Sequence, residues 1–161
     1  MVEDNIIMTA PLSYDPPSEE QDAAAGGPPI PPGTTVLVVE DNVANFVLIA
    51  RLLGYMGIHC EWKTSGYEVV EYADTLPRLD LILMDIRLPY EDGYGALKKI
   101  RSSLNLSGTP VVAVTAEGTA EQMRKARESN FDGFIAKPLD PDRFPDQIRR
   151  ILAGEPVWEL S

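Results

Sequence analysis

The sequence has one cysteine and few basic residues. Cys60 has no second cysteine to pair with, which excludes an internal disulfide framework and fits a reducing compartment such as the cytosol. There are 14 Lys and Arg against 25 Asp and Glu, and the formal net charge is −11. Nucleic-acid binding needs clustered basic residues that neutralise phosphates, so this balance argues against a nucleic-acid partner.

Long hydrophobic runs are also missing. No apolar run approaches the roughly 20 residues that span a bilayer. The N-terminus lacks the basic region and apolar stretch of a secretory signal. We therefore expect a cytoplasmic protein with no membrane partner. What the chain does have is 161 residues, of which 44% are hydrophobic and 24% charged, enough for one domain with a core.

The composition divides the chain into three parts. Residues 1–33 hold seven of the 14 prolines and six acids but no Lys or Arg. Such a segment buries too little apolar surface to offset its ordering entropy, so we predict a disordered Pro-rich acidic arm. The alternative is that its Ile6-Ile7-Met8 cluster docks on a partner. Residues 34–153 are the predicted domain, and 154–161 a C-terminal tail whose Trp158 is either an anchor for a partner subunit or an idle aromatic.

Within the domain, short apolar runs alternate with helical patterns. The predicted strands are residues 35–39, 58–63, 79–84, 110–115 and 133–136, of which the second is the weakest. The predicted helices are residues 43–56 after the N-cap Asn42, a helix from the capping box at Ser65, residues 93–104, a helix from the capping box at Thr119, and residues 140–153 with Pro141 in the first turn. Pro145 predicts that this last helix is kinked or begins late.

Five β-α repeats with continuous apolar strands indicate an α/β fold with a parallel sheet covered on both faces. Right-handed crossovers favour the doubly wound, flavodoxin-like (βα)5 arrangement with strand order 2-1-3-4-5. In such sheets the functional crevice lies at the carboxyl ends of the strands.

Polar residues follow four of the predicted strands at that edge: Glu40 and Asp41, then Asp85, Thr115 and Lys137. Three clustered carboxylates repel one another, and Mg²⁺, which prefers carboxylate oxygens, relieves the repulsion. An aspartate beside it can act as a nucleophile and form an aspartyl phosphate. A lysine and a hydroxyl can stabilise the charge of the transferred group. Taken singly, each residue has a structural interpretation as a helix cap, a β-former or a surface lysine.

Four motifs carry a resemblance to a known family: VLVVEDN (36–42), LILMDIRLPYEDG (81–93), PVVAVTA (110–116) and GFIAKPLD (133–140). On these motifs, residues 34–153 resemble the receiver domain of two-component response regulators. The resemblance implies that Asp85 is the phosphoacceptor. It implies that Glu40, Asp41, Asp85 and the backbone carbonyl of Arg87 hold Mg²⁺. The phosphoryl donor would be a sensor histidine kinase or a histidine phosphotransfer protein.

The resemblance also assigns the switch residues. Thr115 would be the switch hydroxyl and Lys137 the phosphate-binding lysine, and the bond before Pro138 is usually cis in the family. Phe134 stands where the family often has tyrosine, so it would swing inward without a hydroxyl hydrogen bond; simple packing is the alternative. The face made by helix 4, strand 5 and helix 5 would then change shape to control a downstream protein or self-association as a homodimer.

Arg87 and Glu117 lie two residues after Asp85 and Thr115, at positions that influence phosphoryl lifetime in the family. They either pair over the phosphate or are independent surface charges.

Two rival functions have features against them. Phosphatases with an aspartyl nucleophile generally carry an acid two residues later, where this chain has Arg87. A nucleotide-binding module would have a Gly-rich loop after its first strand, where this chain has Glu40-Asp41-Asn42. We therefore expect a phosphoacceptor switch and not a turnover enzyme. We interpret His59 as an ordinary residue of the weakly predicted strand, without a phosphotransfer role. Because only eight residues follow Ala153, we expect a stand-alone receiver without a DNA-binding domain.

Overall fold

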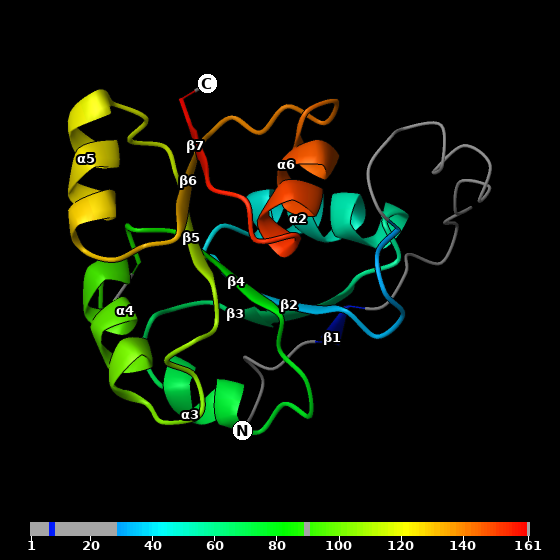
Figure 1. Ribbon diagram of the computed structural model, residues 1–161, viewed down its shortest axis with the longest axis horizontal. Helices are drawn as coiled ribbons and strands as arrows, with labels where there is room; N and C mark the ends of the chain where they lie inside the picture. Colours follow the sequence, from blue (N-terminus) through cyan, green and yellow to red (C-terminus); the bar gives the residue numbers. More distant parts are fainter. Residues whose placement is uncertain (1–6, 9–28, 89–90, 161) are drawn as a thin grey trace.

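A seven-stranded sheet organises the computed structural model, which describes residues 7–8, 29–88 and 91–160 (Figure 1). Its strands are β1 (Ile7–Met8), β2 (Thr35–Val39), β3 (His59–Lys63), β4 (Leu81–Met84), β5 (Val111–Thr115), β6 (Gly133–Ala136) and β7 (Val157–Glu159). The helices are α2 (Val43–Tyr55), α3 (Val69–Asp74), α4 (Gly93–Ser102), α5 (Ala120–Glu128) and α6 (Phe144–Leu152).

The strand order is β1-β3-β2-β4-β5-β6-β7. All neighbours pair in parallel except β1, which is antiparallel to β3. The five strands predicted from the sequence are β2 to β6, and their order β3-β2-β4-β5-β6 is the predicted 2-1-3-4-5. The doubly wound α/β fold is therefore confirmed, with one additional strand at each edge.

Alternating side chains of each central strand serve two cores. In β2, Val36 and Val38 pack in the cluster that includes residues of α2 and α6. Leu37 and Val39 pack in the cluster that includes residues of α3, α4 and α5. Figure 1 shows the same division, with α2 and α6 on one side of the sheet and the other three helices opposite. Both faces are covered, which is why the strand reads as a continuous apolar run.

The predicted N-caps of α2 and α5 are confirmed, and the helix start predicted at Ser65 is wrong. Asn42 and Thr119 cap α2 and α5 by accepting hydrogen bonds from backbone N–H groups three residues later, at 2.9 and 3.1 Å. The helix expected from Ser65 begins only at Val69. The Ser65 hydroxyl accepts from the Tyr67 N–H at 3.2 Å, and Glu68 adopts the left-handed conformation with φ 60°. The apparent capping box therefore closes a local turn.

The last helix also begins later than residue 140. Pro141 lies in a turn in which the Asp140 carboxylate accepts from the Asp142 N–H at 2.9 Å. Helix α6 starts at Phe144, with Pro145 in its first turn. Proline is tolerated in a first turn because its missing N–H would have no helical partner there. The late start predicted from Pro145 is therefore confirmed, and the place predicted for Pro141 is wrong.

Described residues of both segments that flank the predicted domain contribute strands to the sheet. Ile7 and Met8 pair with β3, and Ile30 packs against the core. The remainder of the predicted arm, residues 1–6 and 9–28, lies outside the described residues. In the predicted tail, Gly154 with φ 87° follows α6. The chain then returns along β6 as β7, so Trp158 belongs to the sheet.

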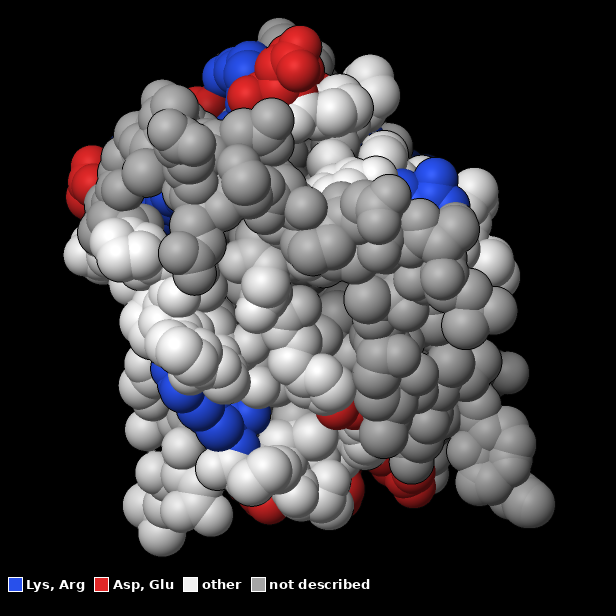
Figure 2. Space-filling model, turned by 90° about the vertical axis from the view of Figure 1, so that its right-hand side faces the viewer, with Lys and Arg blue, Asp and Glu red and all other residues white. Residues whose placement is uncertain are grey.

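Figure 2 shows the side of the molecule that lies at the right in Figure 1. On this face, the described Lys and Arg side chains form separate groups among neutral and acidic residues. Across residues 7–8, 29–88 and 91–160, none of the helices has both the length and the hydropathy to cross a bilayer.

Candidate metal centre

The polar residues predicted to meet at one edge of the sheet do end neighbouring strands. Glu40 and Asp41 follow β2, Asp85 follows β4, Thr115 is the last residue of β5, and Lys137 follows β6. Since β2, β4, β5 and β6 are consecutive in the sheet and parallel, their carboxyl ends lie side by side. The topology alone therefore collects three acids, a hydroxyl and an amine at one place.

The three acids form a compact set of oxygen donors. Glu40, Asp41 and Asp85 each offer a carboxylate oxygen, and these oxygens lie within 4.8 Å of one another. Glu40 is 2% exposed and Asp85 8%, whereas Asp41 is exposed. The cluster thus has two donors embedded in the protein and one at the solvent side, which leaves an approach from outside.

Lys137 joins two of these acids. Its Nζ donates to Glu40 Oε1 at 2.6 Å and to Asp85 Oδ2 at 3.0 Å. Its side chain is 11% exposed, so both contacts are largely shielded from water. The bond from Lys137 to Pro138 is cis. The amine is therefore fixed between the two buried carboxylates and points into the site.

The electrostatics of the site show an excess of negative charge. Burial raises the pKa of Glu40, although the Lys137 hydrogen bond opposes the rise. Burial alone would lower the pKa of Lys137, but the Glu40 hydrogen bond and the Asp85 charge outweigh it and raise that pKa. Both groups hold protons more tightly than usual, Glu40 because of burial and Lys137 because of its two acidic partners, and three carboxylates face this one ammonium. A site of this kind attracts a further cation.

Glu40 is positioned by contacts that the sequence pattern does not reveal. The Asn42 N–H donates to Glu40 Oε2 at 3.1 Å. Trp62, from β3, donates through Nε1 to the Glu40 backbone carbonyl at 2.8 Å. The Trp62 ring stacks on Phe46 of α2 with a centroid distance of 4.0 Å and an interplanar angle of 3°. The stacking fixes the position of the indole, and the indole hydrogen bond in turn fixes the backbone at Glu40.

Asp85 is held from its own loop. Its Oδ1 accepts from the Arg87 N–H at 3.0 Å, which leaves Oδ2 for Lys137. Gly93 donates its N–H to the Ile86 carbonyl at 2.8 Å. A Cβ at Gly93 would lie 2.8 Å from the Asp85 carbonyl oxygen. Only glycine therefore allows the start of α4 to approach the Asp85 backbone so closely.

The remaining predicted residues lie in β5 and β6 or in the loops after β4 and β5. Thr115 is fully buried, and its Oγ1 accepts from the Glu117 N–H at 3.2 Å. Phe134 is also fully buried, on the face of the sheet covered by α5. The Arg87 guanidinium and the Glu117 carboxylate form an ion pair. Of the two interpretations of these charges, pairing is the one observed, with Arg87 73% exposed.

The donor set fits Mg²⁺. The ion prefers carboxylate and carbonyl oxygens and retains water, which the exposed side of the cluster admits. The three residues of this cluster offer only carboxylate oxygens, without the sulfur or imidazole donors that would favour zinc. Two embedded acids, one solvent-side acid and a fixed amine are the arrangement expected where a divalent cation and a phosphoryl group meet.

Comparison with known proteins gives a consistent result. A family model for the response regulator receiver domain matches residues 36–149. The chain is 39% identical over 122 residues to the signal transduction histidine-protein kinase BarA of Escherichia coli K12; the match covers 76% of this chain but only 13% of BarA. It is 32% identical over 139 residues to the probable methanogenesis regulatory protein FilR2 of Methanothrix harundinacea, covering 78% of this chain and 86% of FilR2.

Among solved structures, the receiver domain of the sensor histidine kinase PA1611 from Pseudomonas aeruginosa is similar. The TM-score is 0.68 at 31% identity, over 76% of this chain and 99% of that one. A magnesium ion is coordinated in the active-site cleft of the PA1611 domain.

Proposed function

The chain belongs to the response regulator receiver domain family, and from this premise we propose that it is a phosphorylation-dependent switch with Asp85 as its phosphoacceptor. The donor is the phosphohistidine of a sensor histidine kinase or of a histidine phosphotransfer protein. The observation that carries the proposal is the position of Asp85. Its carboxylate lies among two further acids and a half-buried lysine, at the open end of the central sheet.

In the transfer, a carboxylate oxygen of Asp85 attacks the phosphorus. The nitrogen–phosphorus bond of the donor breaks, and its electron pair returns to the imidazole. Lys137, which already points at Asp85, then pairs with an oxygen of the new phosphoryl group. The Thr115 hydroxyl donates to another, so that both residues stabilise charge spread over the phosphoryl oxygens.

Glu40, Asp41, Asp85 and the backbone carbonyl of Arg87 would hold Mg²⁺, which neutralises the charge of the incoming phosphoryl group. The magnesium ion in the PA1611 receiver domain supports this assignment. So does the set of three carboxylate donors, of which Lys137 contacts two, Glu40 and Asp85.

The output of the switch is the face made by α5, β6 and α6, the helix 4, strand 5 and helix 5 of the sequence prediction. Movement of Thr115 toward the phosphoryl group makes room next to Phe134, which biases an existing equilibrium of this face. The face then controls a protein partner or self-association in the cytoplasm. Arg87 stands where a phosphatase of this chemistry has its general acid, so the protein stores a phosphoryl group and does not turn over phosphomonoesters.

The ion pair of Arg87 and Glu117 sets the phosphoryl lifetime. The two side chains bridge the loops after β4 and β5, which flank Asp85. Because Arg87 is largely exposed, the pair adds little to stability. Its effect is instead to obstruct a water molecule that would attack the aspartyl phosphate.

A labelling experiment tests the proposal. The protein is incubated with Mg²⁺ and a small phosphodonor such as acetyl phosphate, and the phosphorylated fraction is measured by phosphate-affinity electrophoresis, with hydroxylamine treatment to identify an acyl phosphate. We expect labelling of the wild type and of the control Asp74→Asn, which alters an exposed acid on α3, but none of Asp85→Asn. Stoichiometric labelling of Asp85→Asn would exclude Asp85 as the phosphoacceptor.

The same assay tests the role of the ion pair in the phosphoryl lifetime. Glu117→Gln should lose label faster than the wild type, while the exposed control Glu121→Gln should not.

A further inference from the structure

Strand β7 lies on the outer edge of β6, between α5 and α6 (Figure 1). Gly133, Phe134 and Ile135 of β6 pair with residues 157, 158 and 159. A Cβ at Gly133 would lie 2.7 Å from the Val157 carbonyl oxygen, so β7 approaches closely only because this position is glycine. The edge of β6 is therefore shaped to accept a neighbouring strand.

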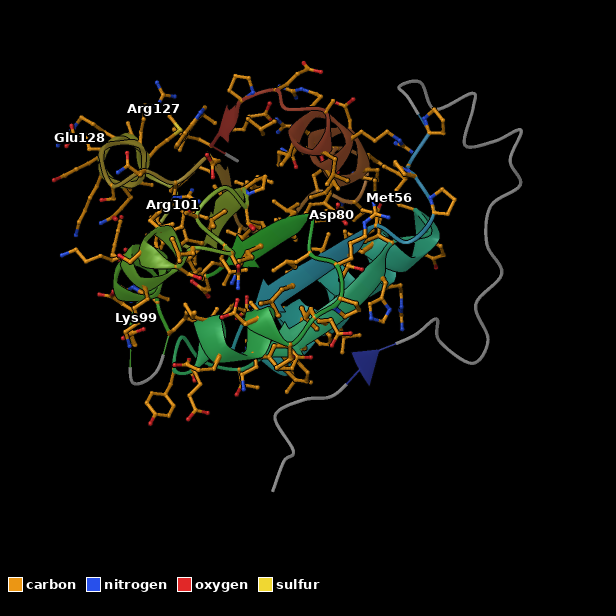
Figure 3. The ribbon with its side chains drawn as sticks, turned by 60° about the horizontal axis from the view of Figure 1, so that its bottom comes forward. Met56, Asp80, Lys99, Arg101, Arg127 and Glu128 are labelled. Atoms are coloured by element: carbon orange, nitrogen blue, oxygen red, sulfur yellow. The ribbon has the colours of Figure 1, made fainter. Side chains whose placement is uncertain are left out.

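The side chains of β7 alternate between the two helices. Val157 is fully buried in the core on the α6 side. Trp158 turns to the opposite side, where it packs half-buried against the core that contains Phe134. The Arg127 guanidinium, which comes from α5 (Figure 3), lies over the Trp158 ring with its Cζ 4.5 Å from the ring centroid. Such cation–π contacts favour an aromatic residue at this place.

Glu159 completes the pattern with three contacts to α6 and the turn before it. Its Oε1 accepts from Arg143 Nη2 and Gln147 Nε2, both at 2.7 Å, and its Oε2 accepts from Arg150 Nη1 at 3.1 Å. The Gln147 hydrogen bond and the Arg150 charge hold the pKa of Glu159 below its usual value. In a chain of net charge −11, the surface beside β6 thus gathers arginines around one acid.

The occupant of this surface is weakly attached. Strand β7 has three residues, and both Trp158 and Glu159 are half-buried. Only residues 153–156 connect it to α6. Short strands with partly exposed contacts open locally at low free-energy cost compared with global unfolding. The surface that β7 covers is therefore accessible to a competitor without loss of the remaining fold.

We propose that the outer edge of β6, with the facing sides of α5 and α6, is a binding site for an extended segment of a partner protein. This segment presents an apolar, an aromatic and an acidic residue at consecutive positions and displaces β7, which carries the same three in cis. Strand addition supplies the backbone hydrogen bonds, and the side-chain sites supply specificity. The site lies on the proposed switch face and names its ligand class, so its role in signalling rests on the proposed function, whereas the competition with β7 can be measured in the unphosphorylated protein.

Charge favours a partner protein over a second copy of this chain. A second copy brings its own net charge of −11 close to the same surface. The connector at residues 153–156 also keeps β7 near its own α6, so exchange would bring two like-charged domains together. A basic or neutral partner with an acidic strand avoids this repulsion.

Competition with a peptide tests the proposal. The probe is a fluorescent peptide of residues 153–160, and its binding to the full chain is measured by fluorescence anisotropy. Glu159→Lys in the protein weakens β7 but leaves the site intact, so we expect it to bind the peptide about tenfold more tightly than the wild type, the factor set by one charge-assisted hydrogen bond. Trp158→Ala weakens β7 through a different contact and should behave likewise. Glu155→Lys, which makes the same charge change at an exposed position before β7, is the control and should bind as the wild type does.

The peptide and the site are varied in turn. A peptide with Glu159→Lys should bind more weakly than the unchanged peptide. Arg143→Ala added to the Glu159→Lys protein, whose β7 no longer uses Arg143, should also weaken binding of the unchanged peptide. Asp85→Asn should bind as the wild type does. Equal binding of the peptide to the wild type, Glu159→Lys and Trp158→Ala would overturn the proposal. So would binding that ignores the acid in the peptide. A concentration-dependent dimer dissolved by the peptide would refute the partner protein and assign a second copy as the occupant.

Discussion

Lys137 offers the most direct test of how the site is balanced, through the variant Lys137→Met. The substitution keeps the length and apolar stem of the side chain but removes the charge between Glu40 and Asp85. Hydrogen bonds to charged groups contribute about 1.5–3 kcal/mol each, and loss of one partner of a buried ion pair costs about 3–5 kcal/mol. Since burial of the amine is itself unfavourable, part of the loss is recovered. We expect the metal-free variant to be less stable by about 3 kcal/mol near neutral pH.

The loss should depend on pH in a defined direction. Burial already raises the pKa of Glu40 in the folded protein above the usual value of a glutamate, and Lys137 opposes that rise. Without the lysine the pKa rises further, so the folded variant binds a proton that the unfolded chain releases. Stability linked to this proton is fully present below the unfolded pKa and is lost as pH rises through the folded one. The difference between the wild type and Lys137→Met should therefore be largest near neutral pH and narrow toward pH 4.

Urea denaturation followed by circular dichroism, in EDTA and at several pH values, measures this difference. Lys98→Met removes the same charge from an exposed position on α4 and serves as the control, with stability close to that of the wild type. Added Mg²⁺ should stabilise Lys137→Met more than the wild type. The reasoning is refuted if Lys137→Met is as stable as the wild type near neutral pH, or if the difference grows as the solution is acidified.

Two other substitutions separate positioning from packing. Trp62→Phe keeps a ring against Phe46 but leaves the Glu40 carbonyl without its donor, so we expect a loss of about 1–2 kcal/mol in urea denaturation and weaker Mg²⁺ binding. Unchanged Mg²⁺ affinity would show that this hydrogen bond does not position Glu40. Gly133→Ala places a Cβ against the Val157 carbonyl oxygen. Because this oxygen belongs to the backbone, it cannot readily move away, and we expect the substitution to lower the free energy of unfolding by about 1–3 kcal/mol. Hydrogen exchange should then rise in β7; unchanged protection there would contradict the close approach.

The sheet and the site were predictable because local pattern and topology agree. Leu37 and Val39 are as apolar as their neighbours Val36 and Val38, and only a strand buried on both faces needs that. Once the parallel order is known, the residues after each strand must meet at one edge. Asp85 and its partners could therefore be assigned from the sequence, although no local feature distinguishes them singly.

The helix predicted at Ser65 failed because tertiary contacts overrode a local signal. Ser65 and Glu68 have the spacing of a capping box, but a Cβ at Gly66 would lie 2.6 Å from the Glu91 carbonyl oxygen. The chain after β3 thus runs close against the backbone at Glu91. Glu68 takes a left-handed conformation before α3 begins. The role of Trp62 was hidden for a similar reason, because its partner Glu40 is 22 residues away in the sequence.

Strand β7 was missed because three residues are too few to show a period, and Gly154 and Pro156 beside them indicate a tail. Its alternation has meaning only when the edge of β6, Arg127 on α5 and Glu159's partners on α6 are in place. Strand β1 is also too short to be recognised from its sequence, and it covers the other outer strand, β3. Exposed sheet edges pair readily with other chains, so covering them protects the fold. A partner that displaces β7 must therefore replace its backbone hydrogen bonds as well as its side chains, which restricts the partner to an extended segment.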